Sequence, residues 1–87
     1  MKIKKGFIVR KGGDENIVVP VGEASKSFHG MIKLNESGAF LWNFYTAEHT
    51  EEEGVSALLS EYEVEREVAE RDVKVFVENL TKNGFAE

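Results

Sequence analysis

Few residues of this sequence have the type and spacing that catalytic or metal chemistry requires. The only histidines are His29 and His49, cysteine is absent, and no glycine-rich phosphate loop follows a predicted strand. His29 falls on an outward strand face with no carboxylate or hydroxyl motif beside it, and His49 falls in a predicted loop between helices. We interpret both as solvated side chains. The sequence therefore predicts a protein that is not an enzyme and that carries no metal and no cofactor.

Length and composition indicate one small folded domain. The 87 residues are 41% apolar and 31% charged, a balance typical of folded chains, and they leave room for a single domain spanning residues 1–87. The lack of cysteine fits a reducing cytosol. No apolar run approaches the roughly 20 residues that span a bilayer, and the basic start precedes too short an apolar run for a signal peptide. We expect a cytoplasmic protein with no membrane partner.

Charge is distributed unevenly along the chain. Residues 1–47 carry seven basic and four acidic side chains, whereas residues 48–87 carry four basic and twelve acidic ones, and the net charge is -5. The second half will therefore repel phosphate backbones. The basic residues that cluster lie near the start of the sequence: Lys2, Lys4, Lys5, Arg10 and Lys11. On a predicted first strand they either protect an exposed sheet edge or bind a partner.

The first part of the sequence predicts a β-hairpin. A strand from Ile3 to Arg10 is rich in β-branched and aromatic residues, and Gly12 to Asp14 supplies the glycines of a tight turn. Asn16 to Val19 is the partner strand. Pro20 ends it because proline has no amide hydrogen for the ladder. Residues 22–27 are interpreted as a loop.

A third strand is predicted from Phe28 to Leu34, with side chains that alternate between two faces. The face directed to the core holds Phe28, Gly30, Ile32 and Leu34. The outward face holds His29, Met31 and Lys33.

A first helix is predicted from Glu36 to Tyr45, because Asn35 is a good N-cap and Glu36 suits the positive end of the helix dipole. Its core face holds Gly38, Leu41, Trp42 and Tyr45, with Ala39 at the margin. Phe40 and Phe44 point roughly the other way. They either pack within the domain, or they form a patch for a partner enzyme or for self-association.

A second helix begins at Thr50, which has the capping-box spacing to Glu53. Its apolar stripe holds Val55, Leu58, Leu59 and Tyr62. Gly54 is interpreted as a mild weakness in its first turn. A third helix is predicted from about Glu65 to Asn83, ending at Gly84 in a left-handed cap with Phe85 as the capping contact.

The apolar arc of this third helix is too wide for a single contact. Its central stripe holds Ala69, Val73, Phe76 and Leu80. Val77 lies beyond one edge, and Val68 and Val75 lie beyond the other, with Asp72 and Asn79 in between. One of these surfaces faces the core, and we interpret the other as the wall of a groove.

Together these elements predict an α+β domain of winged helix-turn-helix-like build, with a three-stranded antiparallel sheet followed by three helices. A winged-helix DNA-binding transcription regulator is therefore the alternative function. Charge argues against it, because the third helix would offer five acidic and four basic side chains to a polyanion. We expect no nucleic acid partner.

The segment from Leu34 to Trp42, Leu-Asn-Glu-Ser-Gly-Ala-Phe-Leu-Trp, resembles the pyrroloquinoline quinone biosynthesis protein D (PqqD-like) family. That family shows Leu-Asn-Glu-Thr/Ser-Gly-Ala-x-Ile/Leu-Trp after its third strand. Further motifs follow in the same order: Tyr62 to Val64 matches Tyr-x-Val, Asp72 to Phe76 matches Asp-Val-x-x-Phe, and Leu80 to Phe85 matches Leu-x-x-x-Gly-Phe/Leu. The resemblance covers nearly the whole chain.

The resemblance implies a leader-peptide recognition element. In the family a leader peptide adds as a strand to the free edge of the third strand and packs against the last helix. Carried over to this sequence, the peptide-binding residues are Phe28, His29, Met31, Lys33, Val68, Asp72, Val75 and Asn79. The family often has Asp where this chain has Glu65, a poorer cap for the last helix. Core packing is the role assigned to Leu34, Trp42, Phe76 and Leu80.

The implied function is that of a non-catalytic peptide chaperone. It would bind the leader of a ribosomally synthesised precursor peptide and present it to a modifying enzyme of the radical S-adenosylmethionine (SAM) type, as in pyrroloquinoline quinone biosynthesis. Because the motifs mainly hold the fold, they fit other peptide pathways equally well. An assembly subunit that only stabilises its enzyme is a third interpretation. The unpaired third-strand edge also allows a homodimer.

Overall fold

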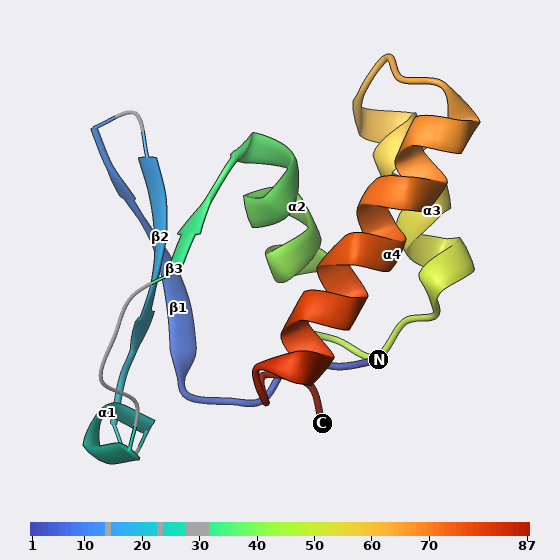
Figure 1. The fold of residues 1–87 in the computed structure, drawn as a ribbon. Helices are drawn as coiled ribbons and strands as arrows, with labels where there is room; N and C mark the ends of the chain where they lie inside the picture. Colours follow the sequence, from blue (N-terminus) through green and yellow to red (C-terminus); the bar gives the residue numbers. More distant parts are fainter. Residues whose placement is uncertain (14, 23, 28–31) are drawn as a thin grey trace.

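Three of the four helices lie on one side of a small antiparallel sheet in the computed structural model, which describes residues 1–13, 15–22, 24–27 and 32–87 (Figure 1). In chain order the elements are β1 (Phe7–Gly12), β2 (Glu15–Pro20), α1 (Ala24–Ser27), β3 (Ile32–Leu34), α2 (Glu36–Phe44), α3 (Glu51–Glu61) and α4 (Arg66–Lys82). The predicted α+β class, with a three-stranded antiparallel sheet followed by three helices, is confirmed.

The sheet has the order β1-β2-β3, which makes β3 an edge strand. The β1–β2 hairpin closes at the pair Gly12 and Glu15, and Gly13 in the turn has a φ of 65°, as predicted from its glycines. β3 pairs with β2 over three residues, from Ile32 to Leu34. No other described strand pairs with its second edge. Residues 28–31 of the predicted third strand lie outside the described residues.

The prediction that the first strand begins at Ile3 is wrong. β1 begins at Phe7, because Gly6 has a φ of 104° and turns the chain out of the sheet. Ile3 instead forms an isolated bridge with Ala86, and its amide donates to the carbonyl oxygen of Tyr45 at 2.8 Å. Of the clustered basic residues, only Arg10 and Lys11 lie on β1, so edge protection cannot be the role of the other three.

The prediction of a plain loop over residues 22–27 is also wrong, because a single helical turn, α1, forms there. Gly22 has a φ of 59° and reverses the chain after β2. Its carbonyl oxygen accepts hydrogen bonds from the Ser25 amide at 3.1 Å and the Ser25 hydroxyl at 2.7 Å. These two bonds close the turn that α1 continues.

The helix ends predicted from local sequence signals lie within one residue of the ends observed in the structure. The Asn35 side chain accepts from the Gly38 amide at 2.8 Å, and Thr50 and Glu53 make both bonds of the capping box. At the end of α4, Gly84 has a φ of 78°, and the Phe85 amide donates to the Leu80 carbonyl at 2.9 Å. This is a Schellman ending. Glu65 precedes α4 without a side-chain capping bond, as expected of a poorer cap.

The core lies between the sheet and the helices. Its largest fully buried side chains are Trp42, Tyr45, Leu41, Val18 and Val73. Phe85 packs edge-to-face against both Trp42 and Phe7, which links the end of the chain to α2 and β1. Among the described helices, none has the length and apolarity needed to span a bilayer.

Candidate functional site

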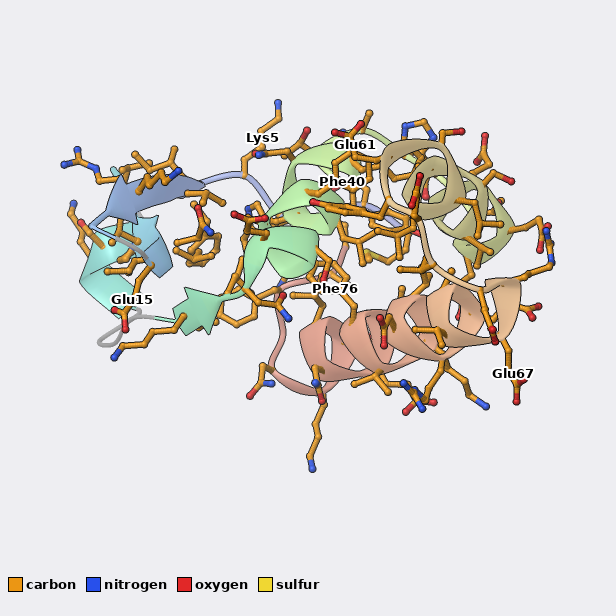
Figure 2. All side chains as sticks on the ribbon, turned by 90° about the horizontal axis from the view of Figure 1, so that it is seen from above. Lys5, Glu15, Phe40, Glu61, Glu67 and Phe76 are labelled. Atoms are coloured by element: carbon orange, nitrogen blue, oxygen red, sulfur yellow. The ribbon has the colours of Figure 1, made fainter. Side chains whose placement is uncertain are left out.

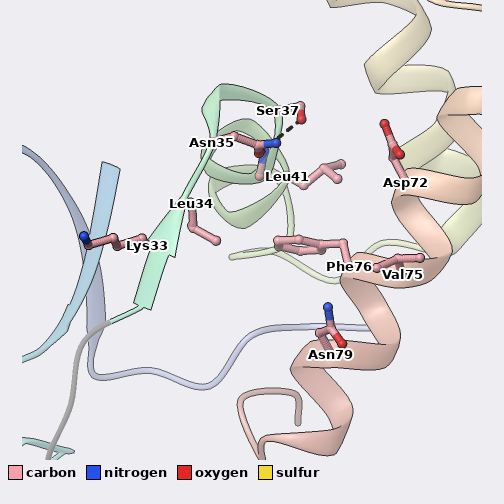
Figure 3. A pocket seen from close by; sticks show the side chains of 10 residues that line it. Lys33, Leu34, Asn35, Ser37, Leu41, Asp72, Val75, Phe76 and Asn79 are labelled. Atoms are coloured by element: carbon pink, nitrogen blue, oxygen red, sulfur yellow. Dashed lines mark hydrogen bonds between the residues drawn. The ribbon is translucent and has the colours of Figure 1, made fainter. Parts of the chain in front are cut away.

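An open groove of about 410 Å³ lies between β3, the start of α2 and the middle of α4 (Figure 3). Its lining residues are Lys33, Leu34, Asn35, Ser37, Gly38, Leu41, Asp72, Val75, Phe76 and Asn79. Because Lys33 and Leu34 of the edge strand β3 line it, the groove runs beside an unpaired edge of the sheet.

The inner wall of the groove is apolar. Phe76 reaches from α4 toward Leu34 on β3, and Leu41 of α2 is 2% exposed (Figure 3). Leu34 and Phe76 are only half-buried, so part of each side chain is open to the groove. Val75 on α4 is 50% exposed, an unusual degree for a large apolar residue. An apolar side chain entering here would bury surface that water now covers.

Polar groups at the rim carry both signs of charge. Lys33 points out from β3 and forms an exposed ion pair with Glu15, with 3.4 Å between Nζ and Oε1. Asp72 on α4 lies 3.9 Å from the Nε of its neighbour Arg71. The side chain of Asn35 is engaged, because it caps α2 and also accepts from the Ser37 hydroxyl at 3.3 Å (Figure 3).

A second hollow of about 300 Å³ continues the groove toward the end of the chain. It shares Lys33, Leu34, Phe76 and Asn79 with the first, and it reaches Phe85 at its far side. Its complete lining is Ile32, Lys33, Leu34, Trp42, Phe76, Asn79, Leu80, Asn83 and Phe85. The two hollows together follow the whole described length of β3.

Four of the eight predicted peptide-binding residues line the same groove: Lys33, Asp72, Val75 and Asn79. Val68 is half-buried on α4 and lies outside the set that lines it. Phe28, His29 and Met31 lie outside the described residues, so their role stays a prediction.

Sequence reasoning missed the groove residues Leu34, Leu41 and Phe76, since it assigned them to the core. The assignment holds in full for Trp42 and Leu80, which are 1% and 5% exposed. Leu34 and Phe76 serve both the core and the groove. The wide apolar arc of the last helix was the one signal that pointed to such a shared position.

Phe40 and Phe44 do not line the groove. Phe40 meets the ring of Tyr62 edge-to-face at 5.8 Å, and Phe44 stacks on the imidazole of His49 with ring centres 4.0 Å apart. Both phenylalanines are half-buried. These contacts favour the interpretation that the two rings pack within the domain, and their use as a partner surface stays a prediction.

His49 is more than a solvated loop residue. Besides stacking on Phe44, it places Nδ1 3.6 Å from Oε1 of Glu53. The Thr50 amide donates to the same carboxylate, and this bond is the first cause of a lowered pKa for Glu53. His49 therefore helps to hold the turn between α2 and α3. No group of three or more metal-ligating side chains occurs in the part of the chain that the structure describes.

The fold and the groove define a class of protein, a winged-helix-like binding domain with an open sheet edge beside its last helix. The chain belongs to the PqqD family, because the sequence model of coenzyme PQQ synthesis protein D matches residues 15–86. The resemblance identified from the sequence motifs is thereby confirmed. No curated protein sequence matches the chain.

Two solved structures are similar to this chain over nearly their whole length. One is TbiB1 in complex with the TbiA(beta) leader peptide, 25% identical with a TM-score of 0.73, and the match covers 100% of this chain and 95% of that one. The other is lasso peptide synthetase B1 complexed with the leader peptide, 27% identical with a TM-score of 0.73, covering 99% and 95%. The comparisons do not support the DNA-binding alternative.

Proposed function

We propose that this chain binds the leader segment of a ribosomally synthesised precursor peptide by adding it as a strand to the free edge of β3. The observation that carries the proposal is the unpaired β3 edge beside a groove with an apolar inner wall. Backbone hydrogen bonds to β3 supply affinity, and the pockets between β3 and α4 choose among side chains. Membership of the PqqD family and two similar structures that hold leader peptides support this role.

The wider role is that of a cytoplasmic chaperone acting as a single module of residues 1–87. It binds without catalysis and presents the leader to a modifying enzyme, and the family resemblance favours an enzyme of the radical SAM type. Residues Phe28, His29 and Met31 extend the β3 edge in this proposal and flank the incoming strand. In the absence of leader, the same edge is available to a second copy of the chain, which would form a homodimer.

Val75→Asp tests the groove directly. The valine is half-exposed on α4, so the substitution should leave the fold intact while placing a desolvated carboxylate against the bound leader. We expect the dissociation constant for a peptide selected by its binding to the wild-type protein to rise tenfold or more, as measured by calorimetry. Tenfold corresponds to about 1.4 kcal/mol.

Val21→Asp is the matched control. Val21 is 38% exposed and lies outside the set of residues that line the groove and its continuation, so leader affinity should stay within about twofold of wild type. Equal affinity of the Val75→Asp and wild-type proteins would show that the peptide does not bind in the groove, and it would contradict the proposal.

A further inference from the structure

A pocket of about 340 Å³ adjoins the groove at the end where β3 gives way to α2. Asn35, Ser37 and Asp72 line both the groove and this pocket, so the two are continuous. Its remaining lining residues are Glu36, Leu58, Tyr62 and Val64. A peptide strand that pairs with β3 and continues past Leu34 would reach this pocket next.

The walls of the pocket are apolar and held in place. Leu58 of α3 is 2% exposed and closes the pocket, while Val64 in the turn before α4 is 40% exposed and leaves an apolar surface open. Tyr62 is half-buried and fixed by its edge-to-face contact with Phe40. In the view from above, Phe40 lies between α2 and α3 (Figure 2). Such a surface accepts an aliphatic chain or stacks with a cation.

Two carboxylates stand at this apolar pocket. Glu36 is the first residue of α2 and forms no ion pair with another described residue. Among the described residues, the basic partner of Asp72 is Arg71, whose Nε lies 3.9 Å from Oδ1. Burial raises the pKa of Tyr62, and the charges of Glu36 and Glu61 raise it further. The phenol therefore lies in a negative potential. Among the described residues that line the pocket, none has a basic side chain.

We propose that this pocket takes a lysine or arginine side chain of the bound leader, from the residues that continue past the strand paired with β3. The aliphatic stem lies along Tyr62 and Val64, and the cationic head reaches Glu36 and Asp72. This inference rests on the proposed function, because it requires the leader to occupy the β3 edge. It also predicts which peptides the domain selects: they have an apolar segment that fills the groove and a basic residue at a constant spacing from that segment.

Selection from a displayed library of random peptides tests the inference without knowledge of the natural leader. The wild-type protein should enrich peptides that combine an apolar alternating segment with Lys or Arg at one spacing from it. The double variant Glu36→Gln/Asp72→Asn should enrich the same apolar segment and lose the basic preference. The control Glu67→Gln/Glu78→Gln removes two exposed charges of α4 outside the pocket and should select as wild type does.

A peptide from this selection then measures how much its basic residue contributes to the binding affinity. Replacing its basic residue with norleucine should weaken binding to wild type about fivefold or more, and should not change binding to the double variant. In addition, Asp72→Lys should shift the preference at that peptide position to Asp or Glu. A retained preference in this charge-reversed protein would contradict the inference.

The outcomes separate this inference from the proposed function. Wild-type selection without a basic preference, or the same preference in the double variant, overturns the basic-residue pocket while leaving strand addition intact. If the selected peptides bind Val75→Asp as tightly as wild type, the groove is not where they bind, and the proposed function itself fails.

Discussion

At the scale of single residues, Tyr45 joins α2 to α3. Its ring is fully buried, and its hydroxyl donates to the Thr50 carbonyl at 2.8 Å. A Cβ at Gly54 would overlap this hydroxyl and would lie 3.0 Å from Cζ of the same ring. Gly54 is therefore a requirement of packing, in addition to being the mild weakness in the first turn that its low helix propensity predicts.

Gly54→Ala should accordingly destabilise the protein, although alanine is the better helix former by about 1 kcal/mol. We expect a net loss of about 1–3 kcal/mol in the free energy of unfolding, because the buried ring cannot move without leaving its hydrogen bond. Urea unfolding of the wild-type and Gly54→Ala proteins measures this difference in free energy. The same substitution in a Tyr45→Phe background should cost less, since the overlapping oxygen is gone. Equal costs in the two backgrounds would show that the overlap is unimportant.

The environment of Tyr45 also makes stability depend on alkaline pH. Burial, followed by the charges of Glu51 and Glu53, raises the pKa of Tyr45 to about 12 from its ordinary value of 10.0. The folded protein therefore holds the phenol proton more tightly than the unfolded chain does. This contribution to stability is fully present below pH 10 and is lost as the pH rises toward 12.

The expected loss in the free energy of unfolding over this pH range is about 2–3 kcal/mol at most. Urea unfolding of wild type and Tyr45→Phe across this range isolates the effect, because lysine titration is common to both proteins. The wild-type free energy should fall more steeply above pH 10. Parallel curves for the two proteins would contradict the assignment.

At the scale of elements, the sheet presents two edges that differ in their surroundings. β3 has the groove and its continuation beside it, both completed by α4. β1, at the other edge, carries Arg10 and Lys11. Charged residues on an edge strand discourage further pairing. The two edges are thus unequal as sites for strand addition.

Hydrogen exchange should report which edge the leader uses. On leader binding, the amides of Ile32 to Leu34 that point away from β2 should gain protection, since they enter a new ladder. The amides of β1 should not change. Exchange followed by NMR resolves individual amides, and Val75→Asp serves as the low-affinity control. Protection that appears on β1 would place the peptide at the opposite edge.

At the scale of the whole molecule, the acidic side chains gather on the helical part. Figure 2 shows Glu67 projecting from the first turn of α4, while Lys5 projects from the segment before the sheet. Residues 48–87 carry twelve acidic and four basic side chains. A polyanion would meet repulsion along α3 and α4, whereas an extended peptide with one or two cations would not.

Salt dependence should therefore be shallow. Between about 50 and 200 mM salt, leader affinity should change by less than about tenfold, because most of the binding comes from backbone pairing and apolar contacts. Binding to duplex DNA through many phosphate contacts would fall on the order of a thousandfold over the same range. Calorimetry or fluorescence anisotropy at several salt concentrations measures the slope. Tight binding to duplex DNA with such a steep slope, together with no measurable binding to leader, would instead favour the DNA-binding regulator.

The features that the sequence alone determined are those set by local chemistry. Asn35, Thr50 and Gly84 satisfy orphan amides or carbonyls at helix ends, and each does so within a few residues of chain. Alternation in the third strand placed Ile32 and Leu34 inward for the same local reason. The class of fold and most of the groove wall on α4 followed from these patterns.

Tertiary structure decided the features in which distant segments share one space. Ile3 lies outside the observed first strand and forms a bridge with Ala86 near the end of the chain. The lack of a Cβ at Gly54 allows the ring of Tyr45, nine residues earlier, to pack against the helix. The pocket beyond β3 joins residues of α2, α3 and α4 that no periodic pattern groups together. Periodicity reports which face of an element is apolar. It does not report which other element covers that face, because that depends on packing between residues far apart in the chain.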